Sequence, residues 1–425
     1  MRIVDIRREE LPALGWAASW FFCVLAAYYT IRPVRETFAS ALGSDEKARL
    51  FAITLVVMLL ATPIYGWLVS RVGRRYLVPT IYGFFISNLL VFRWLLSGGE
   101  PAAWVSQAFF VWISVFNLFV VTLFWGTVVD LFRGDQGKRL FGLIFGAGTL
   151  GQLLSSWCVQ ATSQRLGVAN LLWLSMALLA GAIVCSLNLR RQSISARSSD
   201  ASTSKSGEVT WAKIWQGVAI VAKSPYLLGI AGFILSMSVC ATTVYFQMTE
   251  MVGTQFENDE QRTSWFATVN AAQAIVTLVL QTVVVGWLLR NIGVGRTLAL
   301  VPIVILLGFG ALVFHPTLFV IGAFQVALRA SSFSLGNPAL EVLFTAVAPE
   351  QKYRAKAFID TVGKRSGDVL GAQAYAWMQW LGWAAATLSL AMVPLAAGAI
   401  VLCLILGSAH EQAARIAQVN EADRR

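Results

Sequence analysis

Residues 66–75 of the chain read GWLVSRVGRR, and residues 286–296 repeat the pattern as GWLLRNIGVGR, at an offset of 220 residues. A second, weaker repeat has the spacing Gln-x2-Arg-x8-Gly, and it begins at residue 136 and again at residue 351. Both repeats connect the first part of the chain to the second part with nearly the same offset. The sequence therefore predicts two related halves.

The composition is that of a membrane protein. Of the 425 residues, 57% are apolar and 13% are charged, and the mean hydropathy is +0.66. Apolar runs of about 18 to 25 residues recur, each long enough to cross a hydrocarbon core of roughly 30 Å as a helix. Residues 55–60 are apolar on every side, without the two-residue alternation of a membrane β-barrel. The spans are therefore expected to be helices.

Twelve such segments follow one another, and we predict a membrane-spanning helix in each. Their approximate bounds are 13–34, 50–70, 76–97, 104–131, 139–162, 168–189, 225–249, 264–289, 297–315, 317–346, 355–380 and 383–407. The predicted fold class is an all-α membrane protein with twelve transmembrane helices in two pseudo-symmetric six-helix bundles. Membrane carriers are commonly built from such repeats.

A polar, serine-rich stretch separates the sixth segment from the seventh. Residues 190–207 read RRQSISARSSDASTSKSG, a composition typical of a disordered linker. Residues 211–221 then place large apolar side chains at helical spacing, which predicts an amphipathic helix on the membrane surface. We predict an N-terminal bundle, a cytoplasmic linker region, a C-terminal bundle and a cytoplasmic tail at residues 1–189, 190–224, 225–408 and 409–425.

The net charge of +11 is spread over alternate loops instead of forming one patch, so we expect no nucleic-acid partner. Most lysines and arginines fall in the loops on one side, whereas the other side holds few: Lys47, Arg49, Arg165 and Arg262. By the positive-inside rule, both termini are predicted to be cytoplasmic. The five cysteines show no metal-ligand spacing, and we expect no metal site and no cofactor.

The segment 66–75 resembles the loop signature of the major facilitator superfamily, although Ser70 stands where an acid is usual. The resemblance implies a gating role for the arginines, which can meet helix carboxyl ends and lipid phosphates; the alternative is that they only anchor the loop. We also predict gate pairs between the acids Asp130 and Glu341 and nearby basic residues. The predicted gating residues are Arg71, Arg74, Arg75, Asp130, Arg139 and Glu341, with Arg354 as another basic partner.

Three further motifs are similar to the bacterial branch of the ATP/ADP translocase family: YYTIRPVRE at residues 28–36, VFNLFVVTLFWGTVVDLF at 115–132, and the segment 337–368. The resemblance implies location in the bacterial inner membrane and a phosphate-binding role for Arg32 and Arg35. Asn117 replaces a glutamate of the nucleotide carriers, and the Gly-Lys-Ser-Gly-Gly run of span eleven is missing. The resemblance therefore implies an anionic substrate but does not by itself specify a nucleotide.

Span eleven has charges inside the membrane. Only 39 residues separate Asp368 from Gly407, whereas two crossings and a turn need about 40 or more, so Asp368 must lie within the bilayer. Lys356, Asp360, Lys364 and Asp368 recur every four residues, which allows opposite charges to pair along one helix face. We predict that Asp360 and Asp368 serve coupling or charge balance; a structural ion-pair network is the alternative.

Arg329 lies near the middle of span ten, where an ionised group costs on the order of 3 kcal/mol or more. Its guanidinium is suited to bind a carboxylate or phosphate with two hydrogen bonds. A salt bridge to Asp368 or Glu341 is the alternative. Nearby, the Asn337–Pro338 pair predicts a hinge or a passive kink. The predicted substrate-binding residues are Arg32, Arg35, Asn117, Arg329 and Arg365. The alternative for Arg32 and Arg35 is a cluster on the outer surface. The alternative for Asn117 is ordinary helix packing.

These features favour a secondary active transporter of an organic anion, such as a nucleotide or another phosphorylated solute, working by alternating access. No Gly-x4-Gly-Lys-Ser/Thr loop is present, so we expect neither an ATP-driven pump nor an enzyme with catalytic residues. The expected partners of this monomer are a small anionic solute, membrane lipids, and a coupling proton or counter-substrate. Two alternatives remain: a carrier of a lipid-linked or amphiphilic substrate, and a membrane sensor or scaffold that transports nothing.

Overall fold

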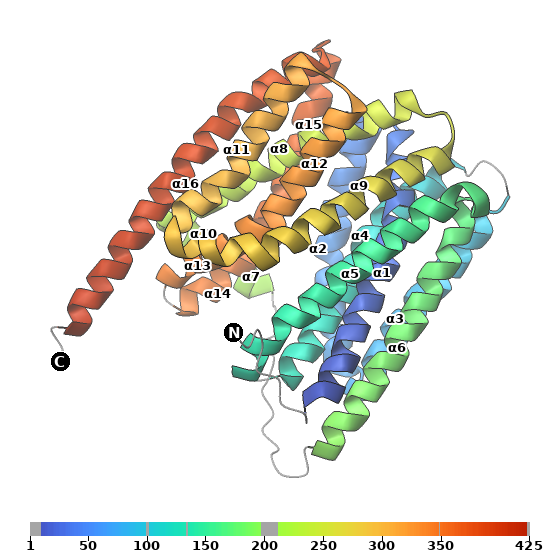
Figure 1. The fold of residues 1–425 in the computed structure, drawn as a ribbon, viewed down its shortest axis with the longest axis horizontal. Helices are drawn as coiled ribbons and strands as arrows, with labels where there is room; N and C mark the ends of the chain where they lie inside the picture. Colours follow the sequence, from blue (N-terminus) through green and yellow to red (C-terminus); the bar gives the residue numbers. More distant parts are fainter. Residues whose placement is uncertain (1–9, 99–101, 133–134, 197–210, 348, 423–425) are drawn as a thin grey trace. The chain divides into compact units, whose positions relative to one another are not determined.

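The computed structural model describes residues 10–98, 102–132, 135–196, 211–347 and 349–422, and the regular structure in this part of the chain is helical throughout (Figure 1). The predicted all-α membrane fold is confirmed. Eleven helices within the described residues are long and apolar enough to cross a membrane. The predicted eleventh span forms a continuous helical segment, Pro349–Trp380, but it is not among these eleven. Its charged side chains account for the difference.

The first half of the chain forms α1 to α6. Their bounds are Leu11–Ser40, Ser44–Arg71, Arg74–Leu95, Ala103–Leu131, Asp135–Leu166 and Leu171–Ala196. A short 3-10 turn, Val168–Asn170, joins α5 to α6. Helix α6 continues through Ala196, so the first residues of the segment predicted as a disordered linker are helical, which corrects that prediction. The rest of the linker lies outside the described residues.

The second half begins with α7, Trp211–Lys223, where the amphipathic helix was predicted. The remaining α-helices are α8 (Pro225–Gln255), α9 (Asp259–Val279), α10 (Val285–Asn291), α11 (Val294–Phe314), α12 (Leu318–Ser331), α13 (Asn337–Leu343), α14 (Pro349–Phe358), α15 (Lys364–Trp380) and α16 (Ala385–Ala422). Helix α16 extends through most of the segment predicted as a tail. Three π-helical turns connect successive helices: η3 (Leu280–Val284), η4 (Ser332–Gly336) and η6 (Ile359–Gly363).

Tertiary contacts divide the chain into two compact units. Unit 1 comprises Met1–Ala41, Val56–Glu208 and Gln255–Ala274, and unit 2 comprises Leu42–Leu55, Val209–Thr254 and Ile275–Arg425. The boundaries cut α2 and α9. Residues 44–55 of α2, from the first half of the sequence, belong to unit 2, and residues 259–274 of α9, from the second half, belong to unit 1. The sequence analysis divided the chain at one point, with all of residues 1–189 in one bundle and all of residues 225–408 in the other. These bundle boundaries stay a prediction.

In unit 1, α1 is the central helix and packs against α4, α5 and α6. Gly151 brings α5 very close to α1, because a Cβ atom at this position would lie 2.4 Å from the carbonyl oxygen of Phe22. The indole of Trp20 is fully buried and donates a hydrogen bond to the Tyr82 hydroxyl, 3.2 Å away. Such buried polar atoms need a partner, and this bond ties α3 to α1.

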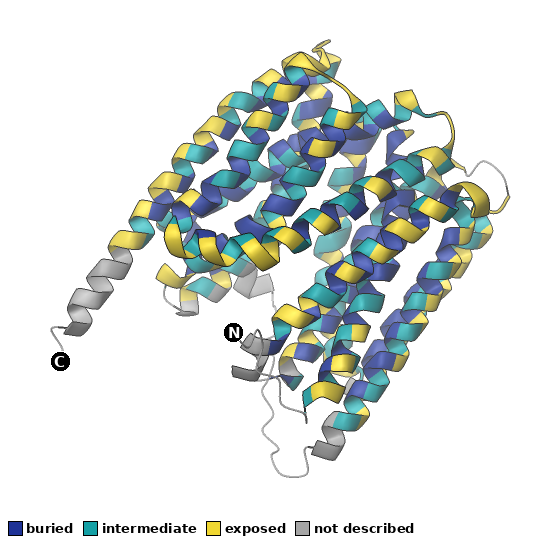
Figure 2. Ribbon diagram, in the orientation of Figure 1, coloured by how far each residue is buried: buried dark blue, intermediate teal, exposed yellow. Residues whose placement is uncertain are grey.

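In unit 2, α11 and α16 lie side by side (Figure 1). Their backbones meet at two glycines: a Cβ atom on Gly407 would lie 2.5 Å from the Cα atom of Gly295. Small residues permit this approach, and close backbone packing is a main source of helix association in lipid. Figure 2 shows buried residues on the faces where helices of a unit meet and exposed residues on the other faces.

The first half of α9 is held in unit 1 by polar contacts. The hydroxyls of Thr37 and Thr263 are 2.7 Å apart and hydrogen-bonded. The side-chain amide of Gln152 donates to the carbonyl oxygen of Asn270 at 3.1 Å. These contacts connect α9 with α1 and α5, which come from the other half of the sequence.

The first half of α2 is held in unit 2 by Lys47, a residue that the sequence analysis placed in a loop. Lys47 instead lies near the start of α2 and is fully buried. Its ammonium donates to the Thr249 hydroxyl at 3.1 Å and to the Glu250 Oε1 atom at 3.5 Å. The Glu250 Oε2 atom accepts from the Tyr375 hydroxyl at 2.8 Å and from the Gln379 amide at 2.9 Å. This Lys47–Glu250 network joins α2, α8 and α15.

Replacing Lys47 with alanine should destabilise the protein, because Glu250 then loses its counter-charge. We expect a loss of about 2 kcal/mol, below the roughly 3–5 kcal/mol of a fully buried pair because the Glu250 side chain keeps 29% exposure. Thermal unfolding of the detergent-purified protein would measure this as a melting temperature lower by several degrees. The exposed Arg49→Ala variant, which removes the same charge from the same helix, should melt like wild type; equal melting of all three proteins would contradict the assignment.

Candidate functional site

Charged residues gather in unit 2 on α12 to α15. We call this group the charge cluster, and it consists of Arg329, Glu341, Lys356, Asp360, Lys364, Arg365 and Asp368. Lys364 interacts electrostatically with Asp368, Arg365, Asp360 and Arg329. Asp360 in turn interacts with Lys356, Glu341 and Lys364. The structure therefore brings all five residues predicted in this part of the chain for substrate binding, coupling and gating into one group.

Two ion pairs lie within the charge cluster. The Arg365 guanidinium donates to the Asp368 Oδ2 atom at 3.4 Å, three residues along the same helix. The Lys356 ammonium donates to Glu341, from α14 to α13. The gate partners predicted for Glu341 were Arg139 or Arg354, so Lys356 is a partner that the sequence analysis did not consider. This partly exposed pair connects α14 with α13.

The charge cluster is accessible rather than sealed in the core. The side chains of Arg365 and Asp368 are 37% and 19% exposed, and Arg329 is half-buried. Charged groups within a membrane span are stable when they face a watery cavity or one another. The pairing of Arg365 with Asp368 meets the second condition, and the partial exposure of Arg365 leaves part of its guanidinium accessible.

A π-helical turn, η6, lies inside the charge cluster and contains Asp360. The backbone N–H of Lys364 donates to the carbonyl oxygen of Ile359, five residues earlier, instead of four. The additional residue rotates the side chains after the turn relative to those before it. The sequence predicted one helix face for the four-residue pattern of Lys356, Asp360, Lys364 and Asp368. The π-turn interrupts this face. Such turns occur frequently at functional sites.

A second π-helical turn, η4, begins three residues after Arg329 and ends directly before the predicted hinge at Asn337–Pro338. Proline has no N–H, and its ring clashes with the carbonyl of the residue four positions earlier, here Ser334. The widened turn, closed by the Asn337 N–H on the Ser332 oxygen, relieves this clash. The Ser334 hydroxyl donates to the Thr277 carbonyl at 3.3 Å, which connects η4 to the end of α9.

In unit 1, Arg32 is buried, with 5% exposure, so the alternative of an outer-surface cluster is wrong for this residue. Its guanidinium donates to the Tyr29 hydroxyl at 3.1 Å and to Glu36 at 3.5 Å, and it lies 5.2 Å from the centroid of the Tyr29 ring. Aromatic faces attract such a cation. Arg32 is thus held in place by α1 itself, and Glu36 is a neighbour that the predicted site left out.

Arg35 lies one turn from Arg32, half-buried, with its guanidinium carbon 4.2 Å from the centroid of the Phe110 ring. Asn117 is half-buried on α4, a helix that packs directly on α1. The three predicted unit 1 residues therefore come from two neighbouring helices. Their contact with a substrate stays a prediction.

The predicted gating residues near α2 and α3 are only partly described. Arg71 ends α2, and Arg75 lies in the first turn of α3; both are exposed. Ser70, at the position where an acid is usual, donates its hydroxyl to the Trp67 carbonyl of its own helix at 2.8 Å. The side chains of Arg74, Asp130 and Arg139 lie outside the described residues, so their gate pairs stay predictions.

The sequence analysis missed two functional candidates. Lys364 was part of the charge pattern but not of the predicted site, although it interacts with four other members of the charge cluster. The Lys47–Glu250 network was missed because both partners lie just outside the predicted spans: Lys47 precedes the span 50–70, and Glu250 follows the span 225–249. A span drawn to the full length of α8 would have included Glu250 as a charge within a helix.

Comparisons with known proteins place this geometry in a family. The model of the Major Facilitator Superfamily matches residues 17–372. An ADP,ATP carrier protein 1 of Chlamydia pneumoniae is 22% identical, over 63% of this chain and 59% of its own length. Its counterpart from Chlamydia muridarum is 24% identical, over 62% of this chain and 56% of its own length. The chain thus matches less than two thirds of the length of these relatives.

Solved structures with a similar fold include the nucleoside transporter NupG in its D323A form, with a TM-score of 0.68 and 11% identity over 94% of this chain and 100% of that one. A bacterial homologue of the iron transporter ferroportin has a TM-score of 0.63 and 14% identity, over 95% and 100% of the two chains. These likenesses concern the fold alone. Together with the family match over residues 17–372, they show that the chain belongs to the Major Facilitator Superfamily and is a multi-pass membrane transporter.

Proposed function

We propose that the chain is a secondary active transporter that moves an organic anion, first of all a nucleotide or another phosphorylated solute, across the bacterial inner membrane by alternating access. The observation that carries this proposal is the accessible charge cluster of unit 2. Around Lys364 it has three cations, with Arg329 and Arg365, but only two carboxylates, Asp360 and Asp368. A group with excess positive charge inside the membrane attracts an anion.

The chemistry of the cations favours a phosphate or carboxylate. A guanidinium presents a planar set of donors that matches two oxygens of such a group, and a lysine ammonium adds a point charge. Arg365 currently donates to Asp368. On binding, an anion would compete with Asp368 for this guanidinium, and the released carboxylate could then interact with Lys364 or take up a proton from the solvent.

The relatives support a phosphorylated solute. The curated relatives are named ADP,ATP carriers. The resemblance of residues 28–36 to the translocase family implies a phosphate-binding role for Arg32 and Arg35. Arg32 is neutralised by Glu36 in this structure. We therefore assign Arg32 a positioning role and assign Arg329, Lys364 and Arg365 the direct contact with the anion. Asn117 would contribute a neutral hydrogen bond from α4.

The division of α2 and α9 between the units suggests how access alternates. Each helix belongs to both units, with boundaries at residues 55/56 and 274/275. Motion of one unit against the other must bend these helices there or exchange their contacts. The turn η3 begins five residues after Ile275, where the second boundary lies, and it contacts η4; both turns offer backbone that is already widened. The proposed orientation places both termini in the cytoplasm.

Uptake of labelled ATP, ADP and phosphate into proteoliposomes, with and without internal counter-substrate, tests the proposal. We expect uptake of at least one of these anions, and a fall of about tenfold to a hundredfold in Arg329→Ala, because a hydrogen bond to a charged group contributes roughly 1.5–3 kcal/mol. Arg329→Lys should recover part of the rate. Arg290→Ala, which removes an exposed arginine from the same unit, should transport like wild type.

No uptake of any of the three anions by well-folded protein would contradict the proposed substrate class. Uptake that is insensitive to Arg329 but sensitive to Arg290 would move the anion site away from the charge cluster.

Asp368→Asn tests the coupling role of the carboxylate. If Asp368 carries a coupling proton, exchange against internal substrate should stay within about threefold of wild type, whereas net uptake driven by an imposed pH gradient should fall by about tenfold or more, which corresponds to an increase of about 1.4 kcal/mol in the barrier to that transport mode. Asp45→Asn, an exposed acid near the start of α2, is the matched control. An equal fall in both transport modes would show that Asp368 serves charge balance alone.

A further inference from the structure

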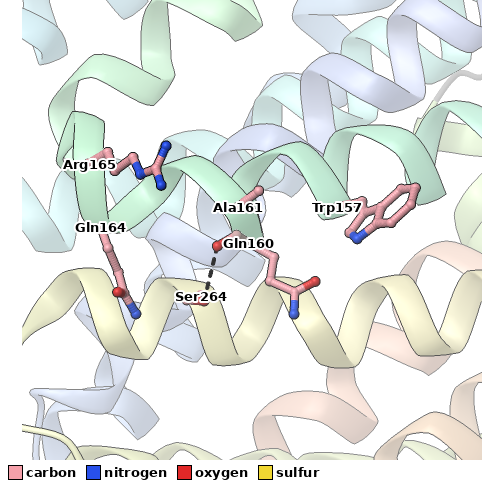
Figure 3. A pocket seen from close by; sticks show the side chains of 6 residues that line it. All are labelled: Trp157, Gln160, Ala161, Gln164, Arg165 and Ser264. Atoms are coloured by element: carbon pink, nitrogen blue, oxygen red, sulfur yellow. Dashed lines mark hydrogen bonds between the residues drawn. The ribbon is translucent and has the colours of Figure 1, made fainter.

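A cavity of about 430 Å³ lies in unit 1, between the end of α5 and the first half of α9. It is separate from the charge cluster, and its volume is within the roughly 300–1,000 Å³ of small-molecule sites. Figure 3 shows the side chains that line it: Trp157, Gln160, Ala161, Gln164, Arg165 and Ser264.

The lining of this cavity is suited to an anion. Arg165 supplies a positive charge, two glutamine amides and a hydroxyl add hydrogen-bonding groups, and none of the lining residues is acidic. The Ser264 hydroxyl donates to the Gln160 carbonyl at 3.3 Å, which fastens α9 to α5 at the floor of the cavity (Figure 3). Arg165 lies in the last turn of α5, at the end of a membrane span, where lipid headgroups are found.

Below Arg165 the same face of α5 becomes apolar and stays exposed. Ala161, Trp157, Leu154 and Leu150 follow at spacings of three or four residues, and the Trp157 side chain is 65% exposed. From Arg165 to Leu154 the helix rises about 16 Å at 1.5 Å per residue. Half of a hydrocarbon core of about 30 Å is about 15 Å. The face therefore extends from the headgroup level to the middle of the membrane.

We infer that this face binds one anionic phospholipid, with its phosphate at Arg165 and Gln164 and an acyl chain along Trp157, Leu154 and Leu150. A soluble phosphate would use only the polar end, so the apolar continuation assigns the site to a lipid. Ser264 is the one lining residue that comes from α9, and its hydroxyl already joins α9 to α5. This inference does not depend on the transported substrate.

Native mass spectrometry of the detergent-purified chain, titrated with phosphatidylglycerol or phosphatidylcholine, tests the site. Wild type should bind one phosphatidylglycerol in preference to phosphatidylcholine, and Arg165→Gln should weaken this binding at least about fivefold, the effect of about one surface charge. The matched control is Arg49→Gln, an exposed arginine near the start of α2 that is not part of the cavity; its affinity should stay within about twofold of wild type. Equal weakening in both variants, or none in either, overturns the site.

Two further measurements separate a lipid from a soluble anion. Inorganic phosphate at millimolar concentration should not displace the bound phosphatidylglycerol; displacement would assign the cavity to a soluble anion. Phosphatidylglycerol with brominated acyl chains should quench the fluorescence of wild type more than that of Trp157→Phe, and this difference should shrink in Arg165→Gln. No difference between wild type and Trp157→Phe would show that no acyl chain lies along this face.

Discussion

Hydrocarbon cannot form hydrogen bonds, and this constraint shapes every helix of the protein. Within lipid each backbone polar group must find its partner inside the protein, which makes the spans helical. The same solvent makes an unpaired charge costly. Arg32, Lys47 and Arg365 each lie in such helices, and each has an acid within 3.5 Å. The fold is thus a set of helices that meet where charges can be paired and backbones can approach.

Two kinds of contact hold the helices together within each unit: close backbone approach at glycines, and polar contacts to the parts of α2 and α9 that come from the other half of the sequence. Gly151 fits α5 against α1, and Gly295 with Gly407 fits α11 against α16. The first halves of α2 and α9 are attached differently, through polar groups such as Lys47 with Glu250 and Thr37 with Thr263. Glycine packing suits contacts that persist. These polar contacts are buried too, because Lys47, Thr37 and Thr263 are all fully buried.

The charge cluster combines paired charges with irregular backbone. The turn η6 contains Asp360, and η4 follows Arg329, so two of its members lie beside widened helical turns. A π-turn changes which side chains share a face without ending the helix. Lys364 therefore meets charges from α12 and from its own helix together. This arrangement gathers cations and acids from several segments of unit 2 into one group.

Composition and apolar length were sufficient to predict the helical membrane fold and the position of α7, because both depend on short-range pattern and on the thickness of the bilayer. The depth of Asp368 in the membrane stays a prediction. Other features became visible only in the folded chain. Lys47 pairs with Glu250, and Glu341 pairs with Lys356. Helices α2 and α9 are divided between the units, and η6 interrupts the helix face that holds Asp360 and Lys364. Partners that are about 200 residues apart, such as Lys47 and Glu250, leave no periodic trace in a single sequence. A π-turn likewise leaves no mark in the sequence, because the helical pattern of apolar residues continues on both sides of it.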